Sequence, residues 1–494
     1  MIRPVRPDRL VGALAALLQG GLSTSTGVRS GAVVTPDHDA LVDDDGALTY
    51  RELDALVDGV AAVLHDRGVR EGDRVGILCR NHRGFVATMV AAVRMGADVV
   101  YLNTGFAGPQ VDDATQREGV TLLVRDDDLA PCKVAATVSA GELVAVASAW
   151  SGPPAPASRR GGRHVILTSG TTGRPKGAAR ATGGSGRAIV GLLEAIPLRH
   201  GQRTMVAAPL FHVWGWSHFS LGLALRATCL LDRTSDPVRL AHRMVDDRAD
   251  VLVTVPVLLR RILDADVALP ALRLVALSGS PLPAGLARDA ISRLGEVVYN
   301  LYGATEAGWI SVAGPGDLHA APGTAGRPVT GVSLRVVDAD GRDVPPGSIG
   351  RIGVESDLML EGYTDGSALR RDGGLLLLGD LGRVDDAGRL HVVGRADDMV
   401  VSGGENVYPS EVEDLLTAHP DVAEVAVVGV PDPEFGQRLR AVVVAVPGSS
   451  LAAEAVRDHV RADLARHKVP RDVVFVDALP RNAAGKVLRR ELAQ

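Results

Sequence analysis

A segment rich in serine, threonine and glycine follows the short apolar run Val165–Leu167 and has a lysine near its end. The segment from Thr168 to Gly177 reads Thr-Ser-Gly-Thr-Thr-Gly-Arg-Pro-Lys-Gly. Glycines let backbone N–H groups approach an anion closely, and the hydroxyl and ammonium groups add further donors. Such a cluster alone would suit a plain surface loop, but its place directly after an expected strand favours a polyphosphate site. It is not a Walker A loop, because Gly-x4-Gly-Lys-Ser/Thr occurs nowhere in the chain.

Three further segments carry side chains that suit nucleotide chemistry. Singly, each has a plainer interpretation: Asp380 suits a turn, Glu306 a helix start, and Lys486 a solvated surface. Their order along the chain, together with the first segment, is what carries the chemical interpretation. The segments are Asn300–Glu306 (Asn-Leu-Tyr-Gly-Ala-Thr-Glu), Gly379-Asp380 with Gly394–Asp398 (Gly-Arg-Ala-Asp-Asp), and Pro480–Lys486 (Pro-Arg-Asn-Ala-Ala-Gly-Lys).

In content, order and spacing, these four motifs resemble the adenylate-forming superfamily of acyl-CoA synthetases, adenylation domains and luciferases. The resemblance covers the chain from about Thr49 to Leu492. Within that superfamily, three other segments look like bacterial fatty acyl-CoA synthetases: Leu102–Phe106, Pro209–Gly215 and Ser402–Pro409. One departure is Leu378, which stands before Gly379-Asp380 where the family commonly has threonine.

The resemblance implies roles for the charged residues. Glu306 looks like the carboxylate that binds Mg²⁺, a hard ion that prefers oxygen ligands, and Thr305 like a contact of the α-phosphate. Asp380 would accept hydrogen bonds from the ribose hydroxyls, with Arg395 as a second contact. Lys486 resembles the lysine that bridges the carboxylate and the α-phosphate, where its charge offsets the developing negative charge.

The resemblance also implies the residues that surround the nucleotide. Those expected to bind the β- and γ-phosphates are Thr168, Ser169, Gly170, Thr171, Thr172, Gly173 and Lys176. Those expected to form the adenine pocket are Gly279, Ser280, Pro281, Asn300 and Tyr302. Leu301, Gly303 and Ala304, in the same segment, are also expected to bind the nucleotide.

The acid and the thiol are expected at separate places. His212 is interpreted as a catalytic or gate residue beside the acyl pocket, which Val213, Trp214, Gly215 and Trp216 would help to line. A metal site at His212 and His218 is not favoured, because no cysteine or carboxylate cluster accompanies them. Gly403 and Gly404 would let the pantetheine arm of coenzyme A pass, and Asp397 would be the hinge between two half-reactions.

Apolar runs expected as strands, the last of them Val297–Val298, alternate with helices along most of the chain. This alternation predicts an α/β fold with largely parallel sheets. Thr49 and Glu52 fit a helix-capping box after a turn at Asp43–Thr49. Short strands with Gly/Pro turns from about Pro322 to Arg383 predict a small β-rich subdomain. After it, Pro409 can begin a helix. We expect a large N-terminal domain of α/β layers at 1–396 that includes this subdomain, and a small, mobile α+β C-terminal domain at 397–494.

The bulk composition excludes several classes of protein. The chain has 494 residues, 46% of them hydrophobic, and a formal net charge of −6, which gives no general attraction to nucleic acid. Three scattered cysteines indicate a reducing compartment and neither a disulfide framework nor a metal cluster. The apolar run Leu10–Leu18 is shorter than the roughly 20 residues of a membrane span. We expect this run to form an amphipathic first helix packed on a cytoplasmic protein without a transmembrane segment; weak peripheral membrane contact stays an alternative.

These expectations combine into one reaction. The chain would be an AMP-forming acid–thiol ligase that uses ATP and Mg²⁺ to convert a carboxylic acid, best a medium- or long-chain fatty acid, into acyl-AMP. Coenzyme A would then take the acyl group, giving acyl-CoA, AMP and pyrophosphate. Two alternatives stay open: capture of the acyl-AMP by an amine or a carrier-protein thiol, or a nucleotide-binding regulatory protein without turnover. The two tryptophans could also narrow the pocket towards aryl or shorter acids, or be plain core residues.

Overall fold

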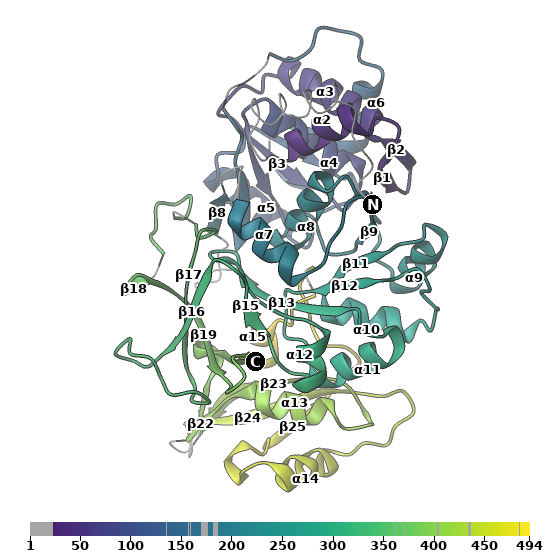
Figure 1. Cartoon of the computed structure of the whole chain (residues 1–494). Helices are drawn as coiled ribbons and strands as arrows, with labels where there is room; N and C mark the ends of the chain where they lie inside the picture. The colour runs from purple at the N-terminus through teal and green to yellow at the C-terminus, as the bar shows by residue number, and fades with distance from the viewer. Residues whose placement is uncertain are drawn as a thin grey trace. The chain divides into compact units, whose positions relative to one another are not determined.

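The computed structural model describes residues 23–494 except 135, 157, 159, 169–175, 181–185, 361, 370, 403–404, 433–435 and 484. The chain divides into two compact units (Figure 1). Unit 1 comprises Met1–Thr254, Arg261–Ala276 and Asp357–Leu369, and unit 2 comprises Val255–Arg260, Leu277–Ser356 and Arg370–Gln494. The short segment Asp357–Leu369 therefore belongs to unit 1 although its neighbours in sequence belong to unit 2.

One sheet of unit 1 leads to the polyphosphate motif. Its strand order is β6-β5-β3-β4-β7-β8, and the strands run parallel except that β8 returns antiparallel to β7. Thr168 pairs with Lys176 at the end of that hairpin, so the motif is the connection between β7 and β8. The strands are β3 (Arg74–Leu78), β4 (Asp98–Tyr101), β5 (Leu122–Arg125), β6 (Thr137–Ser139), β7 (His164–Thr168) and β8 (Lys176–Arg180).

A second sheet crosses unit 1 in the order β11-β9-β10-β1-β2. Its inner strands are parallel and buried at almost every position, as expected for strands covered on both faces. Only the edge hairpin of β1 and β2 is antiparallel among these five. The strands are β1 (Asp39–Asp43), β2 (Gly46–Thr49), β9 (Arg203–Val206), β10 (Thr228–Leu230) and β11 (Val251–Thr254).

Helices of unit 1 pack against these strands and against one another. The expected capping box is confirmed: Thr49 N–H and Oγ1 both bond Glu52 at 2.8 Å, and Glu52 N–H donates to Thr49 Oγ1 at 3.3 Å. Helices α2, α3, α4 and α6 pack on one another. The helices that lie wholly in unit 1 are α2 (Thr24–Val34), α3 (Tyr50–Asp66), α4 (Arg83–Arg94), α5 (Gly108–Arg117), α6 (Ala140–Ser148), α7 (Gly186–Ala195), α8 (Val213–Ala224) and α9 (Pro237–Asp246).

Two elements have residues in both units: α10 (Pro256–Asp264) and β12 (Leu274–Leu277). Unit 2 then continues with short strands and Gly/Pro turns, which confirms the β-rich character expected there. Strands β16, β17 and β19 form an antiparallel sheet to which β18 and β20 add. The elements are α11 (Ala284–Leu294), β13 (Val298–Ala304), β14 (Gly308–Ala313), α12 (Pro315–Ala320), β15 (Arg327–Pro328), β16 (Val332–Val337), β17 (Gly350–Ser356), β18 (Arg371–Asp372), β19 (Leu375–Val384) and β20 (Leu390–Arg395).

The last hundred residues of unit 2 form an α+β layer with its own apolar core. The helix expected at Pro409 is confirmed as α13, and β25 lies parallel to β24. This layer comprises η1 (Ala396–Asp398), β21 (Val400–Ser402), β22 (Glu405–Val407), α13 (Pro409–Thr417), β23 (Val422–Asp432), β24 (Gly436–Ala445), α14 (Ala453–Asp463), η2 (Arg466–Lys468), β25 (Asp472–Phe475) and α15 (Arg489–Leu492).

Two expectations about strands were wrong in detail. The segment Asp43–Thr49 is not only a turn, because Gly46–Thr49 is β2, which pairs with β1. This edge strand is exposed or half-buried, so it lacks the apolar pattern by which strands are recognised. The strand expected at Val297–Val298 continues to Ala304, because pairing with β14 holds its glycine and polar residues extended.

The three cysteines, Cys79, Cys132 and Cys229, are free thiols. Within the described part of the chain, no helix combines the length and the apolar character that crossing a bilayer requires.

Candidate active site

Unit 2 brings together four of the residues expected to contact the nucleotide. Tyr302, near the end of β13, donates its hydroxyl hydrogen bond to Asp380 Oδ2 at 2.6 Å. Arg395, the last residue of β20, donates to Asp380 Oδ1 at 3.2 Å. Strands β19 and β20 pair so that Asp380 lies directly opposite Arg395. Burial raises the pKa of Asp380, while Tyr302, Arg395 and the nearby ammonium of Lys486 act to lower it.

The loop that carries Lys486 is closed by its own hydrogen bonds. Asn482 N–H donates to the Lys486 carbonyl at 2.9 Å, and Lys486 N–H donates to Asn482 Oδ1 at 2.9 Å. Arg481 bonds the Gly485 carbonyl at 2.8 Å and Glu424 at 2.7 Å, which ties the loop to β23. The Lys486 side chain is exposed. It therefore presents its charge towards Asp380 from a fixed backbone.

The remaining expected nucleotide residues of unit 2 lie in β13, in the turn after it, or in the loop after β12. Thr305 and Glu306 are half-buried in the turn between β13 and β14, where Ala307 N–H bonds the Ala304 carbonyl at 3.2 Å. Asn300 is buried and its side chain donates to the Thr324 carbonyl at 3.4 Å. Gly279 follows β12 with a φ of +89°, a backbone conformation that favours glycine. Ser280 and Pro281 continue that loop, and Leu301 and Gly303 belong to β13.

Unit 1 carries the polyphosphate motif and the expected acyl segment. Ser169, Gly170, Thr171, Thr172 and Gly173 lie outside the described residues, as do Gly403 and Gly404 of unit 2. The motif's last cation is described: Lys176 Nζ lies 3.0 Å from Ser367 Oγ and 3.4 Å from Asp365 Oδ2, with the Tyr363 ring centroid at 5.3 Å.

Sequence reasoning missed these partners of Lys176. They belong to the segment Asp357–Leu369, which joins β8 through Thr364: its N–H donates to the Gly177 carbonyl at 2.8 Å and its hydroxyl to Glu118 Oε1 at 2.9 Å. The only local signal is Asp365-Gly-Ser, which indicates a turn and no partner. The separation of 191 residues between Lys176 and Ser367 hides the contact from pattern reasoning.

His212 begins α8 as its N-cap residue. Its Nε2 is buried and has no hydrogen-bond partner among the residues that the structure describes. Gly215 is required one turn later, because a Cβ there would come within 2.3 Å of the Pro209 carbonyl oxygen. Trp214 is 6% exposed, donates Nε1–H to the Thr254 carbonyl at 2.9 Å and lies 4.0 Å from His218 between ring centroids. Val213 and Trp216 pack against the core of unit 1.

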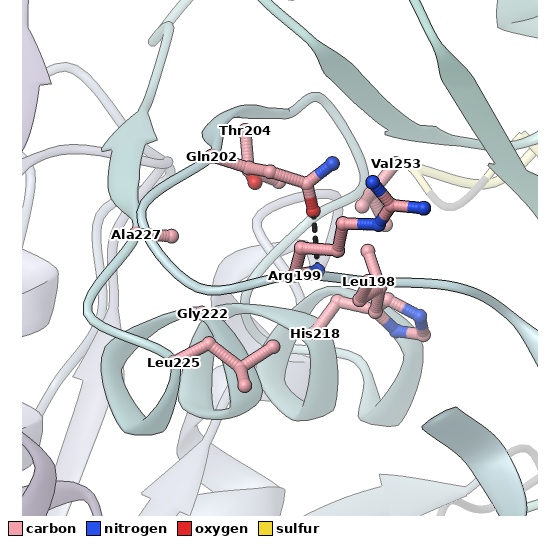
Figure 2. Close-up of a pocket in the computed structure, with 9 residues that line it drawn as sticks. All are labelled: Leu198, Arg199, Gln202, Thr204, His218, Gly222, Leu225, Ala227 and Val253. Carbon is pink, nitrogen blue, oxygen red and sulfur yellow. Dashed lines mark hydrogen bonds between the residues drawn. The ribbon is translucent and has the colours of Figure 1, made fainter. Parts of the chain in front are cut away.

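A small cavity lies behind α8 (Figure 2). His218, Gly222 and Leu225 line it from the helix, with Leu198, Thr204 and Val253 among the residues opposite. Its volume of about 10 Å³ leaves room for about one water molecule. His218 Nε2 is buried and has no hydrogen-bond partner in the described part of the chain.

Three buried histidines make unit 1 sensitive to acid. Burial lowers the pKa of His164 to about 3 and those of His212 and His218 to about 4. An unfolded histidine has a pKa of about 6.5. Between these values the unfolded chain binds protons that the folded chain does not, so stability is lost as pH falls.

We therefore expect the free energy of unfolding to fall from about pH 6.5 to 4, by about 1.4 kcal/mol per pH unit for each histidine. Urea denaturation at several pH values, followed by tryptophan fluorescence, measures this slope. His218→Gln should reduce it, whereas His242→Gln, at an exposed position, should not. An unchanged slope in His218→Gln would show that His218 is protonated in the folded chain.

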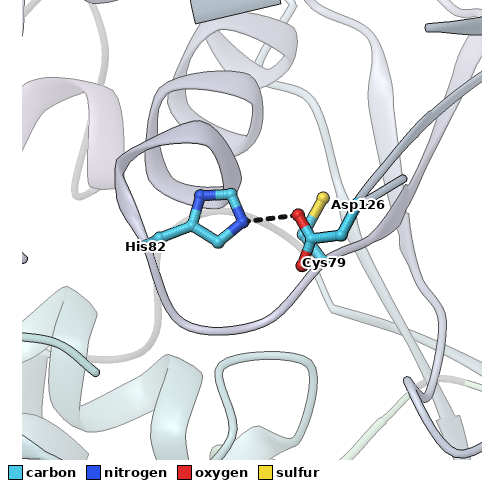
Figure 3. A group of neighbouring side chains, drawn as sticks. All are labelled: Cys79, His82 and Asp126. Carbon is cyan, nitrogen blue, oxygen red and sulfur yellow. Dashed lines mark hydrogen bonds and ion pairs between the residues drawn. The ribbon is translucent and has the colours of Figure 1, made fainter. Parts of the chain in front are cut away.

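A second cluster, Cys79, His82 and Asp126, has the composition of a metal site (Figure 3). His82 Nε2 bonds Asp126 Oδ1 at 2.7 Å, and Nδ1 accepts the Gly84 backbone N–H at 3.0 Å. Both ring nitrogens are thus used, the second as the cap of α4. Burial raises the pKa of the Cys79 thiol, which keeps it protonated. We interpret the cluster as a structural helix cap.

Asp397, the expected hinge, lies in η1. Proline is tolerated in the first turn of a helix, with φ fixed near −65°. Asp397→Pro should therefore keep the observed arrangement, in which Lys486 lies near Asp380, and hinder any other. We expect acyl-adenylate formation within about threefold of the parent and thiol transfer slowed by ~100-fold. Separate assays of the two half-reactions measure this, and equal effects on both would contradict a hinge at this residue.

Two family models and the sequences of known proteins match most of the chain. The chain matches the family model "AMP-binding enzyme" over residues 28–364 and "AMP-binding enzyme C-terminal domain" over residues 411–486. A feruloyl-CoA synthase of Amycolatopsis sp. is 35% identical over 484 residues, covering 93% of this chain and 96% of that one. An indoleacetate–CoA ligase of Aromatoleum aromaticum is 33% identical over 477 residues, covering 90% and 93%.

Solved structures of related enzymes share the architecture. The o-succinylbenzoate CoA synthetase of Bacillus subtilis, solved with its acyl-adenylate intermediate, superimposes with a TM-score of 0.85 at 27% identity, covering 95% of this chain and 98% of that one. The amide bond synthetase of Marinactinospora thermotolerans gives 0.82 at 27% identity, with the same coverage. The expected α/β fold with a large N-terminal and a small C-terminal domain is confirmed. The chain belongs to the AMP-binding enzyme family, and its expected class, an AMP-forming acid–thiol ligase, is confirmed at that level.

Proposed function

We propose that this chain uses Mg·ATP to convert an aromatic carboxylic acid into an acyl-adenylate and then transfers the acyl group to coenzyme A. The observation that carries the proposal is the cluster around Asp380, a half-buried carboxylate that accepts hydrogen bonds from Tyr302 and Arg395 and lies near the charge of Lys486. A carboxylate accepts hydrogen bonds from both hydroxyls of a ribose, and a tyrosine ring offers a flat face to a base. These side chains therefore fit the ribose and the base of a nucleotide.

In the first step these residues would bring the carboxylate of the acid close to the negatively charged α-phosphate of ATP. One carboxylate oxygen of the acid bonds to the α-phosphorus while the bond to the β-phosphate oxygen breaks, and pyrophosphate leaves. Lys486 would stabilise the negative charge that builds up between them, and Asp380 with Arg395 would hold the ribose in line. Glu306 would bind Mg²⁺, which screens the phosphates when bound. In the second step the thiol sulfur attacks the acyl carbonyl carbon, loses its proton and displaces AMP.

The residues after His212 support an aromatic acid. The Trp214 indole is held by its hydrogen bond to the Thr254 carbonyl, so a large flat side chain occupies the segment expected to line the acyl pocket. Aromatic rings stack favourably on such faces. The feruloyl and indoleacetate ligases named above act on aromatic acids by their names, which adds to the case against the fatty acid expected from the sequence motifs.

Turnover of an acid panel tests this proposal. With ATP, Mg²⁺ and coenzyme A, we expect hydroxycinnamic or arylacetic acids to give a higher kcat/KM than octanoate or palmitate, measured as thioester by mass spectrometry. Trp214→Val should shift the ratio of aryl to alkyl kcat/KM by about tenfold towards octanoate. The ratio does not depend on the fraction of folded enzyme, and Trp150→Val is the matched control. If turnover by the parent enzyme rises with alkyl chain length, the substrate is a fatty acid and the aromatic assignment is wrong.

The amide bond synthetase among the similar structures supports a second candidate. Here an amine nitrogen, in place of the thiol, would attack the acyl-adenylate. Aromatic acid with ATP and an added amine would give an amide, and coenzyme A would give no thioester. The same panel, run with each acceptor separately, decides between the two.

A further inference from the structure

Val255, directly before α10, and Val257, in its first turn, touch the loop that carries Lys486. A Cβ built on Gly485 would lie 2.7 Å from Val257 Cγ1 and 3.4 Å from Val255 Cγ2. Real Cβ contacts do not occur at the first of these distances, so this approach requires glycine. Gly485 also has a φ of +78°, in the left-handed region that glycine enters without steric cost. The Gly485 backbone is thus seated directly on the Val257 side chain.

The loop meets this surface as a preformed turn. The reciprocal hydrogen bonds of Asn482 and Lys486, and those of Arg481 to Gly485 and Glu424, lie within the last hundred residues. None of them involves α10. The internal hydrogen bonds fix the shape of the turn. The contact of the turn with Val255 and Val257 therefore determines where the Lys486 side chain can reach.

Val255 connects the turn to the segment expected to bind adenine. A Cβ on Gly279 would lie 3.4 Å from Val255 Cγ1, an ordinary contact distance, while Val255 Cγ2 faces Gly485. One buried side chain, 8% exposed, therefore contacts both loops. With the turn in this place, the Lys486 ammonium acts on the Asp380 carboxyl.

We propose that Val255 and Val257, the valine pad, are positioning residues that set Lys486 for acyl-adenylate formation. The pad touches no reacting atom: it acts through the Gly485 backbone, which only a residue without a side chain lets approach this closely. This inference rests on the proposed function, because it needs Lys486 to act in the adenylation step. In this inference the valine pad affects acyl-adenylate formation and has no part in the transfer to the thiol.

A double-mutant cycle tests the contact. Gly485→Ala adds a methyl group against Val257 and strains the backbone, and we expect acyl-adenylate formation to fall by about 100-fold. In a Val257→Ala background the Cγ1 atom is gone, so the same substitution should cost about tenfold less, with the backbone strain remaining. Pyrophosphate release with the best acid measures the first step. Thioester formation from supplied acyl-adenylate should change by less than about threefold in all variants.

Val238→Ala, at an exposed position of α9, is the matched control background and should give no rescue. If Gly485→Ala lowers the rate of acyl-adenylate formation equally in the Val257→Ala and parent backgrounds, backbone strain alone explains the effect. That result would overturn the role of the valine pad. Equal losses in both half-reactions would overturn its assignment to adenylation.

A Val257→Cys/Gly485→Cys variant supplies a readout besides activity. We expect mild oxidation to form a disulfide between the two positions, found by peptide mapping. A disulfide in this variant, together with a parent chain that releases no pyrophosphate with any acid, would support the contact and reject the proposed function. No disulfide, together with no rescue, would reject the pad while leaving turnover by the parent enzyme intact.

Discussion

Replacing Lys486 with alanine lowers the rate of acyl-adenylate formation by about 10²–10³-fold, the loss seen when one preorganised charge-stabilising group is removed. The reason is that two anions must meet at the α-phosphorus, and Lys486 is the ammonium that its loop holds near Asp380. The fold should persist, because the side chain is exposed and the turn is closed by backbone groups, Asn482 and Arg481. Pyrophosphate release under single-turnover conditions measures the rate.

The second half-reaction provides the internal comparison. Thioester formation from supplied acyl-adenylate should fall by less than about tenfold in Lys486→Ala, because no bond to phosphorus forms in that step. Lys133→Ala, at another exposed lysine, is the matched control and should leave both rates unchanged. If Lys486→Ala forms the acyl-adenylate at nearly the parental rate, Lys486 has no catalytic role in this step.

Glu306→Gln should weaken the use of Mg·ATP by ~100-fold at low Mg²⁺ and partly recover at high Mg²⁺. A neutral amide is a poorer Mg²⁺ ligand than a carboxylate of the same size. Glu306 lies in the turn between β13 and β14, so the backbone that presents it is fixed by strand pairing on both sides. Initial rates over a Mg²⁺ titration at fixed ATP measure the effect.

Stability separates this role from a structural one. Without nucleotide, the melting temperature of Glu306→Gln should stay close to that of the parent chain. The exposed Glu296 offers a matched control, Glu296→Gln. A variant that melts earlier yet turns over normally at every Mg²⁺ concentration would make Glu306 a structural residue.

The elements that position the site could largely be predicted where local chemistry determines them. The capping box at Thr49 and Glu52 and the start of α13 at Pro409 depend on neighbours within a few residues, and both are confirmed. The buried parallel strands have continuous apolar runs. Strand β2 lacks that pattern because it is a half-exposed edge, and the end of β13 is held extended by β14.

The contacts within the site could not be predicted from local pattern. Tyr302 and Asp380 are 78 residues apart, and only the pairing of β19 with β20 brings Arg395 to the same carboxylate. The motif residues could be named from the sequence as a set, but their mutual geometry depends on tertiary structure. The Lys176 partners and the valine pad carry no motif, because a valine or a turn aspartate at these positions is chemically ordinary.

The most direct test of the account follows oxygen from the acid to the nucleotide. The parent enzyme is given an aromatic acid labelled with ¹⁸O in its carboxylate, together with unlabelled ATP, Mg²⁺ and coenzyme A. If the carboxylate attacks the α-phosphorus, the AMP released contains one ¹⁸O atom from the acid, the pyrophosphate contains none, and the thioester keeps the other. Label in inorganic phosphate with ADP as the product, or AMP without label, would contradict acyl-adenylate formation.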